Sequence, residues 1–280
     1  MNMKKTSILL VSVILAASSA FAWSKKSENT GNLGRMYMSI AGGVQMNKAT
    51  MSSGVIPPAG AKSDPTSTPT GADASFVINA PIFKPGVNAF KNIKWAGVDG
   101  QVFFDYNYSG EYKANYVSGV STTTELSNTS YSVGAALIPY LNFDIDLPFL
   151  QAVKPFGMGF VAFEWSDTNA TSTLTYLDGL SDSYSAFKYG VGAGVEFVIL
   201  DELSFTPYWK WVCSTHDSAP CVQHVGAELA YWFTDQFCVS VFWNHSFGGV
   251  STSDFDGDYY SLDMKHGDII GAKFKIGFMR

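Results

Sequence analysis

Apolar and polar residues alternate with a period of two along the stretch from Tyr184 to Asn244. In its first run, residues such as Val191 and Phe197 occupy the odd positions, and Lys188 and Glu196 occupy even ones. This period is the side-chain repeat of a β-strand with one apolar face. Four runs share the pattern, over residues 187–199, 203–211, 225–233 and 237–243. They predict four strands joined by very short turns.

The rest of the chain carries the same alternation in shorter stretches. Six more runs are found at residues 36–44, 98–108, 112–120, 131–145, 161–165 and 270–278. Ser109-Gly110, between two of them, predicts a tight hairpin turn. The pattern therefore predicts an all-β fold of ten antiparallel strands. An eight-stranded fold fits if one early hairpin is misread.

A long segment without such a period follows the first strand. Its first part, GVIPPAGAKSDPTSTPTGADAS, is rich in Pro, Thr, Ser and Gly, which break strand pairing. Its second part, FVINAPIFKPGVNAF, is apolar but is interrupted by Pro81 and Pro85. Residues 47–94 are therefore predicted to form one long external loop. The sequence leaves open whether residues 76–90 fold into the barrel mouth or pack on its rim.

The N-terminus decides between a soluble sandwich and a membrane barrel. A positive start, Met1 to Lys5, precedes an apolar core and the cleavage pattern Ala20-Phe21-Ala22. These features predict a secretory signal peptide over residues 1–22. No other apolar run is long enough for a spanning helix, so insertion into a membrane would use strands. We therefore expect residues 23–280 to form a closed antiparallel transmembrane β-barrel in the cell outer membrane.

The lengths of the breaks between strands are consistent with this topology. Short breaks alternate with long ones, as periplasmic turns alternate with external loops in outer-membrane barrels. The short breaks are 109–110, the turn before Pro155, 200–202 and 234–236. The long ones are 47–94, 121–130, 167–182, 214–220 and 248–266. An even number of strands also returns the C-terminus to the periplasm.

The chain resembles small bacterial outer-membrane barrels of the OmpA, OmpW and opacity-porin type. The resemblance is one of architecture and is strongest in YGVGAGVEFVILDELSFTPYWKW and VGAELAYWFTDQFCVSVFW, which pair strands around short acidic turns. It implies that outer-membrane lipid, lipopolysaccharide and the barrel-assembly machinery are partners. Such proteins usually end in an aromatic residue that the assembly machinery recognises, whereas here Phe278 is followed by two more residues.

Polar positions on the opposite strand face are predicted to line the lumen. They carry charges of both signs: Asp99, Asp105, Lys113, Asp144, Glu164, Lys188, Glu196, Lys210, Glu228, Lys273 and Lys275. A barrel of eight to ten strands is narrow and largely filled by side chains, so these charges are expected to pair. This favours a plugged, ion-paired lumen. The alternative is a narrow pore for small solutes or hydrophobic compounds.

The three cysteines lie in a chain predicted to be exported, where disulfides persist. Cys213 and Cys221 bracket a short external loop and have outward parity, so they are predicted to form a disulfide. Cys238 has inward parity near the periplasmic end and is expected to be a small buried apolar residue.

No sequence motif indicates an enzyme, a cofactor or a metal site. The aspartates at 254, 256, 258 and 263 do not have calcium-loop spacing, and we interpret them as solvated loop acids. An omptin-like surface protease would need Asp and His pairs across the barrel mouth, for which His216, Asp217, His245 and Asp254 are the candidates. No motif links them, so we expect no catalytic activity.

Composition and aromatic placement complete the sequence interpretation. A net charge of −6 without a basic cluster argues against a nucleic-acid partner. Several aromatic residues are expected to anchor the membrane interfaces: Trp95, Tyr108, Trp165, Trp209, Trp211, Tyr231, Trp232 and Trp243. We predict a structural or surface-interaction role, with external loops open to a host or environmental ligand.

Overall fold

The computed structural model describes residues 31–53, 62–63, 66–83, 95–118, 120–145, 147–172, 179, 181–199, 202–216, 221–255 and 258–278. Within these ranges every regular element is a β-strand. The described part of the chain has no helix that is both long enough and apolar enough to cross a membrane.

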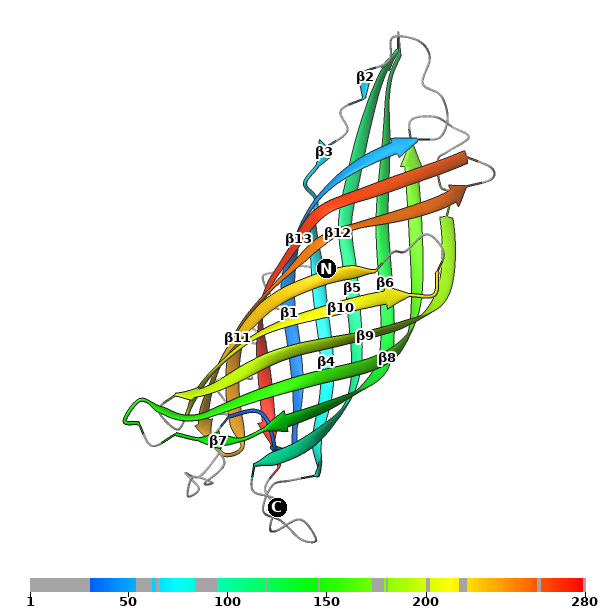
Figure 1. The fold of residues 1–280 in the computed structure, drawn as a ribbon. Helices are drawn as coiled ribbons and strands as arrows, with labels where there is room; N and C mark the ends of the chain where they lie inside the picture. Colours follow the sequence, from blue (N-terminus) through cyan, green and yellow to red (C-terminus); the bar gives the residue numbers. More distant parts are fainter. Residues whose placement is uncertain are drawn as a thin grey trace.

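Ten long strands form one closed antiparallel barrel (Figure 1). They are β1 (Tyr37–Ser53), β4 (Thr70–Phe83), β5 (Ala96–Ser118), β6 (Val120–Leu141), β8 (Leu150–Ser172), β9 (Ser181–Ile199), β10 (Leu203–Ser214), β11 (Val222–Thr234), β12 (Phe237–Phe255) and β13 (Asp258–Gly277). Three two-residue strands pair at the margins: β2 (Lys62–Ser63), β3 (Thr66–Ser67) and β7 (Phe143–Asp144). The predicted fold class and strand number are confirmed, and the eight-stranded alternative is wrong.

Pairing of the last long strand with the first closes the barrel. β13 pairs with β1 from Tyr37↔Gly277 to Ser53↔Tyr260, with one register shift after Lys48. A closed barrel has no free strand edge, so the backbone hydrogen bonds of its ladders are made internally. Closure therefore allows this sheet to cross a hydrocarbon layer.

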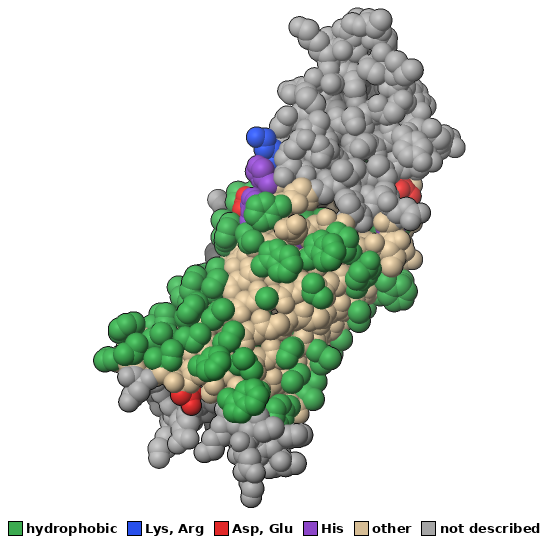
Figure 2. Space-filling model, viewed as in Figure 1, with side chains coloured by type: hydrophobic (Ala, Val, Ile, Leu, Met, Phe, Trp, Pro, Cys, Tyr) green, Lys and Arg blue, Asp and Glu red, His purple; other side chains and the backbone are tan. Residues whose placement is uncertain are grey.

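The outer wall of the barrel is apolar. Val102, Leu137 and Val161 are each more than half exposed, whereas Asp99 and Glu196 on the opposite strand face are fully buried. Figure 2 shows hydrophobic side chains in bands across this wall, and the few charged side chains in view lie at the borders of the bands. This is the inverse of a soluble sandwich, and it matches the lipid-facing surface of a transmembrane barrel. The chain is thus an outer-membrane β-barrel.

The prediction of one loop over residues 47–94 is wrong for β4, which lies inside that range. β4 pairs with β1 on one side and with β5 on the other, and its Phe76 and Ile78 side chains face outward. Pro81 does not prevent this pairing because it lies near the strand end, beside a register shift in the β4–β5 ladder. Of residues 76–90, those from 84 onward lie outside the described part.

The hairpin predicted at Ser109-Gly110 is also wrong, because both residues lie within β5. The ladder with β6 continues from Tyr108↔Thr129 to Glu111↔Ser127 across a register shift. Gly110 has a φ of +78°, which suits a β-bulge in which one strand carries an extra residue. The two errors cancel in the strand count. The two strands predicted on either side of residues 109–110 are one strand, β5, and the predicted loop 47–94 contains the additional strand β4.

We call the end of the barrel that carries the start of β1 and the end of β13 the periplasmic end. The short connections β9–β10 and β11–β12 are also at this end, as the topology rule for outer-membrane barrels requires. At the opposite, external end the strands are longer than predicted. The predicted loop 121–130 belongs to β6, and most of 248–266 belongs to β12 and β13. In Figure 1, β5 and β6 rise beyond the other strands.

The predicted disulfide between Cys213 and Cys221 is confirmed. It joins the external ends of β10 and β11, whose Cα atoms are 4.0 Å apart at these residues. The ladder below it runs from Val212↔Val222 to Leu203↔Tyr231, so the two strands are already paired without the bond. Cys238 is fully buried at the periplasmic end and packs with Tyr37, as expected.

Replacing both bonded cysteines by serine is expected to leave the barrel folded. The chain-entropy estimate for a closed loop of eight residues is about 2.5 kcal/mol, and a strained native bond would contribute less. We expect a modestly lower urea midpoint and an unchanged heat-modifiable gel shift in C213S/C221S. A chain that no longer gave the folded band would show that the disulfide is needed to form the barrel.

Candidate functional site

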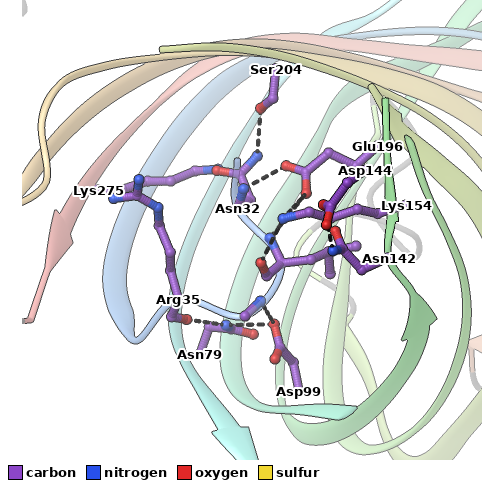
Figure 3. A network of polar contacts seen from close by, with 12 residues as sticks. Asn32, Arg35, Asn79, Asp99, Asn142, Asp144, Lys154, Glu196, Ser204 and Lys275 are labelled. Atoms are coloured by element: carbon purple, nitrogen blue, oxygen red, sulfur yellow. Dashed lines mark hydrogen bonds and ion pairs between the residues drawn. The ribbon is translucent and has the colours of Figure 1, made fainter. Parts of the chain in front are cut away.

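The periplasmic end of the lumen contains the chain immediately before β1. We call residues 31–36 the N-terminal segment. A hydrogen bond of 3.4 Å from the Arg35 N–H to the Asn32 carbonyl turns the segment back on itself. Its backbone and side chains then contact inward-facing residues from strands around the barrel, as Figure 3 shows. These contacts form one connected polar region at this end of the lumen.

Glu196 of β9 receives the first part of the segment. Its carboxylate accepts hydrogen bonds from the backbone N–H of Asn32 and, at 3.1 Å, from that of Leu33. Lys154 of β8 lies 3.9 Å from the same carboxylate and donates to the Leu33 carbonyl at 3.2 Å. Because Glu196 is fully buried, its charge is compensated by these backbone groups and by one buried lysine.

Asp99 of β5 holds the second part of the segment. It accepts a hydrogen bond of 2.9 Å from the Gly34 N–H and one of 3.1 Å from the side-chain amide of Asn79. The same amide donates to the Arg35 carbonyl at 2.7 Å. Asn79 and Asp99 are both almost completely buried. β4 and β5 therefore contribute one shared anchor for the turn.

Cationic side chains complete the network on the side of β11 to β13. The Arg35 guanidinium donates to the Asp235 carbonyl at 3.3 Å and lies 4.4 Å from the centre of the Trp232 ring. Lys275 donates to the Asn32 side-chain oxygen at 2.8 Å and to Glu228. The segment is thus bonded to strands on all sides of the lumen.

Packing and backbone conformation fix the segment further. Leu33 is buried in a small apolar cluster with Ile138 and Tyr140. Gly34 has a φ of +83°, and a Cβ atom there would lie 2.7 Å from the Tyr140 hydroxyl oxygen. A side chain at this position would therefore be strained and would collide with the wall.

A cavity of about 400 Å³ lies in the lumen beyond this network. Its wall includes the aromatic side chains of Phe103, Phe160 and Tyr208. Its charged lining residues are Asp73, Asp105, Glu164, Lys188, Lys210 and Lys273. Lys188 and Glu164 form an ion pair, and Lys273 pairs with Glu228 at 2.6 Å. The lumen is therefore divided into a bonded periplasmic end and a cavity with charged walls.

Nine of the eleven predicted lumen charges have described inward-facing side chains. Three contact the N-terminal segment and six line the cavity or pair with its lysines: Asp99, Glu196 and Lys275, and Asp105, Glu164, Lys188, Lys210, Glu228 and Lys273. Lys113 lies in β5, but its side chain is outside the described part.

Asp144 lies beyond the end of β6, which is at Leu141. Asp144 lies in β7 with an exposed side chain and accepts a hydrogen bond of 2.9 Å from the Asn142 amide. It is paired with Ala152, so it lies on the face of β8 that also carries Lys154, at the periplasmic mouth of the barrel.

Two predicted positions differ in the structure. Trp232 is almost completely buried and packs against Tyr37 and Arg35 inside the barrel, so it does not anchor a membrane interface. His245 shares the outward face of β12 with the exposed Trp243, and both side chains contact Asp268 at 2.9 Å. It therefore does not face His216 across the barrel mouth. Asp217 and the side chain of Asp254 lie outside the described part.

Sequence reasoning missed the contacts of the N-terminal segment and three of the polar residues in the lumen. Asp73 and Asn79 belong to β4, which was predicted to be loop because of the prolines in that segment. Lys154 was predicted to lie in a turn but belongs to β8. A local signal for the segment is present, since Gly31 and Gly34 bracket a turn just before the first strand. That spacing predicts a turn, but it does not place the turn inside a barrel.

Comparison with protein-family models and with curated protein sequences finds no match. Solved structures with similar shape are outer-membrane barrels. The transport unit of the autotransporter AIDA-I from Escherichia coli has a TM-score of 0.48 at 11% identity, covering 96% of this chain and 97% of that one. The outer membrane protease OmpT from Escherichia coli has a TM-score of 0.43 at 12% identity, and the match covers 90% of this chain and 99% of that one. Ail, the attachment invasion locus protein of Yersinia pestis, has a TM-score of 0.32 at 13% identity, and the match covers 86% of this chain and 99% of that one.

Proposed function

We propose that this outer-membrane barrel has a structural or surface-interaction role and that its N-terminal segment closes the lumen to solute flow. The supporting observation is the bonding of the segment to Glu196 and Asp99. Three consecutive backbone N–H groups, of Asn32, Leu33 and Gly34, are paired with these two buried carboxylates. Hydrogen bonds to charged groups are among the stronger ones in proteins, and several act together here.

The charges left in the lumen support a closed state as well. The carboxylates Glu164, Glu196 and Glu228 each have a lysine partner. A conducting pathway would have to pass these paired groups and then the periplasmic end of the lumen, where the segment already lies. In this proposal the barrel acts through its surfaces: the apolar wall contacts lipid and lipopolysaccharide, and the external end meets a host or environmental ligand. The assembly machinery acts during biogenesis, and the proposal includes no catalytic residue.

Recording the refolded protein in a planar lipid bilayer tests the closed lumen. A heat-modifiable gel shift first establishes that the barrel has formed. We expect a silent membrane, because the buried pairs at Glu196 and Asp99 hold the segment in place. A steady open current from folded wild-type protein would instead support the second candidate, a narrow pore for small solutes, which the cavity of about 400 Å³ favours.

A further inference from the structure

We propose that the lumen cavity is a binding site for a small zwitterionic solute, one that carries a cationic and an anionic group a few bonds apart. This goes beyond the closed lumen proposed above. The cavity has a volume of about 400 Å³, within the range of about 300–1,000 Å³ typical of small-molecule sites. Its lining combines aromatic rings with charged groups of both signs, as such sites do.

The charged residues that line the cavity are grouped by sign around the wall, and the further carboxylate Glu228 on β11 is paired with Lys273. The lining carboxylates come from one half: Asp73 on β4, Asp105 on β5 and Glu164 on β8. The lysines come from the other half: Lys188 on β9, Lys210 on β10 and Lys273 on β13. Lys188 is paired with Glu164, and Lys273 with Glu228. The lining charges without an ion-pair partner among the described residues are therefore Asp73 and Asp105 on one side and Lys210 on the other. The electric field between charges of opposite sign on two sides of the cavity orients a dipolar molecule.

Asp105 and Lys210 are the central pair of this field. Each is the strongest charged neighbour of the other. However, no oppositely charged group among the described residues lies within 4.0 Å of either side chain. Both side chains therefore line the cavity without forming an ion pair with each other across it. A solute with an ammonium group toward Asp105 and a carboxylate toward Lys210 would complete both contacts.

Neutral polar groups beside the lysines support the same assignment. His224 Nδ1 and Asn244 Oδ1 are buried atoms of residues that line the cavity, and neither has a hydrogen-bond partner among the described residues. Buried polar atoms are nearly always satisfied, so these two indicate bound water or a ligand. They lie on β11 and β12, between Lys210 and Lys273 around the barrel. In the tautomer with its proton on Nδ1, His224 can donate to a carboxylate group, whereas Asn244 Oδ1 accepts a hydrogen bond from a water or from an N–H group of the ligand.

Calorimetric titration of the folded protein in detergent micelles tests the site. The probes are 4-aminobutyrate and 6-aminohexanoate, with butyrate and butylammonium as single-charge controls. We expect saturable binding of at least one zwitterion, and affinities for the single-charge analogues at least about tenfold weaker, since each lacks one charge-assisted contact. Folded protein that binds none of the probes would show that the cavity holds water only and would overturn the proposal.

Three variants locate the binding. Lys210→Met and Asp105→Asn each remove one pole, and each is expected to weaken binding at least about tenfold. The swap Asp105→Lys with Lys210→Asp reverses the local field, so it should restore binding with the solute turned around. Lys48→Met, at an exposed outward position, is the matched control. Because Asp105→Asn is nearly isosteric, it keeps the test decisive if Lys210→Met does not fold.

Unchanged binding in both single variants would place the solute elsewhere and overturn the proposal. The result is separable from the closed lumen, because binding is measured without a current. A conducting wild-type protein would contradict the proposed closure while leaving the titration to decide the binding site.

Discussion

A chain that begins at Met36 is expected to conduct ions where the full-length protein is silent. The deletion removes the backbone donors that occupy Glu196 and Asp99, together with the buried Leu33 side chain. Water can then reach the periplasmic end of the lumen. The ladders of β1 with β4 and β13 begin at Tyr37, so the barrel pairing is left intact. We expect the mean current in planar bilayers to rise at least about tenfold, as closure by several buried bonds predicts.

Two further variants make this result specific. Glu196→Gln keeps the shape of the side chain but weakens its bonds to Asn32 and Leu33, so brief openings are expected. Asp144→Asn changes an exposed charge at the same end of the barrel and should stay silent. If the shortened chain folds, as the gel shift reports, and remains silent, then the segment does not close the lumen.

Glu228→Ala is expected to cause the largest loss of stability among single substitutions in the lumen. Glu228 pairs with Lys273 at 2.6 Å and also with Lys275, which is almost completely buried. Removing one partner of a buried ion pair leaves an uncompensated charge and typically costs about 3–5 kcal/mol. A decrease of that size in the free energy of unfolding should appear in urea titrations of the barrel in detergent.

The double variant Glu228→Gln with Lys273→Met is the informative comparison. It keeps a hydrogen-bond acceptor for Lys275 while removing one of the two lysines that Glu228 serves. We expect it to recover part of the lost stability, whereas Asp144→Asn should lie within about 0.5 kcal/mol of wild type, as surface substitutions usually do. An equal, small effect of all three variants would show that the lumen pairs contribute little to stability.

The fold was predictable because, in each strand of a transmembrane barrel, apolar residues that face lipid alternate with polar residues that face the lumen. Residues such as Val191 and Glu196 alternate between lipid and lumen, so the period of two carries both strand position and side-chain direction. For the same reason, nine lumen charges and the Cys213–Cys221 bond followed from parity. The alternation did not reveal β4, because the prolines in that segment indicated a loop.

The sequence by itself therefore determined the barrel, its strand parity and the types of charge inside it. Only the tertiary structure decided what those charges do. Glu196 and Lys188 both have inward parity, yet one holds the N-terminal segment and the other lines a cavity. Their partners are Asn32 of the N-terminal segment and Glu164 of the neighbouring strand β8. Which of these groups lie at the same height in the lumen depends on the register around the whole barrel. Register and closure are properties of all ten strands together, so no local pattern specifies which buried charges meet.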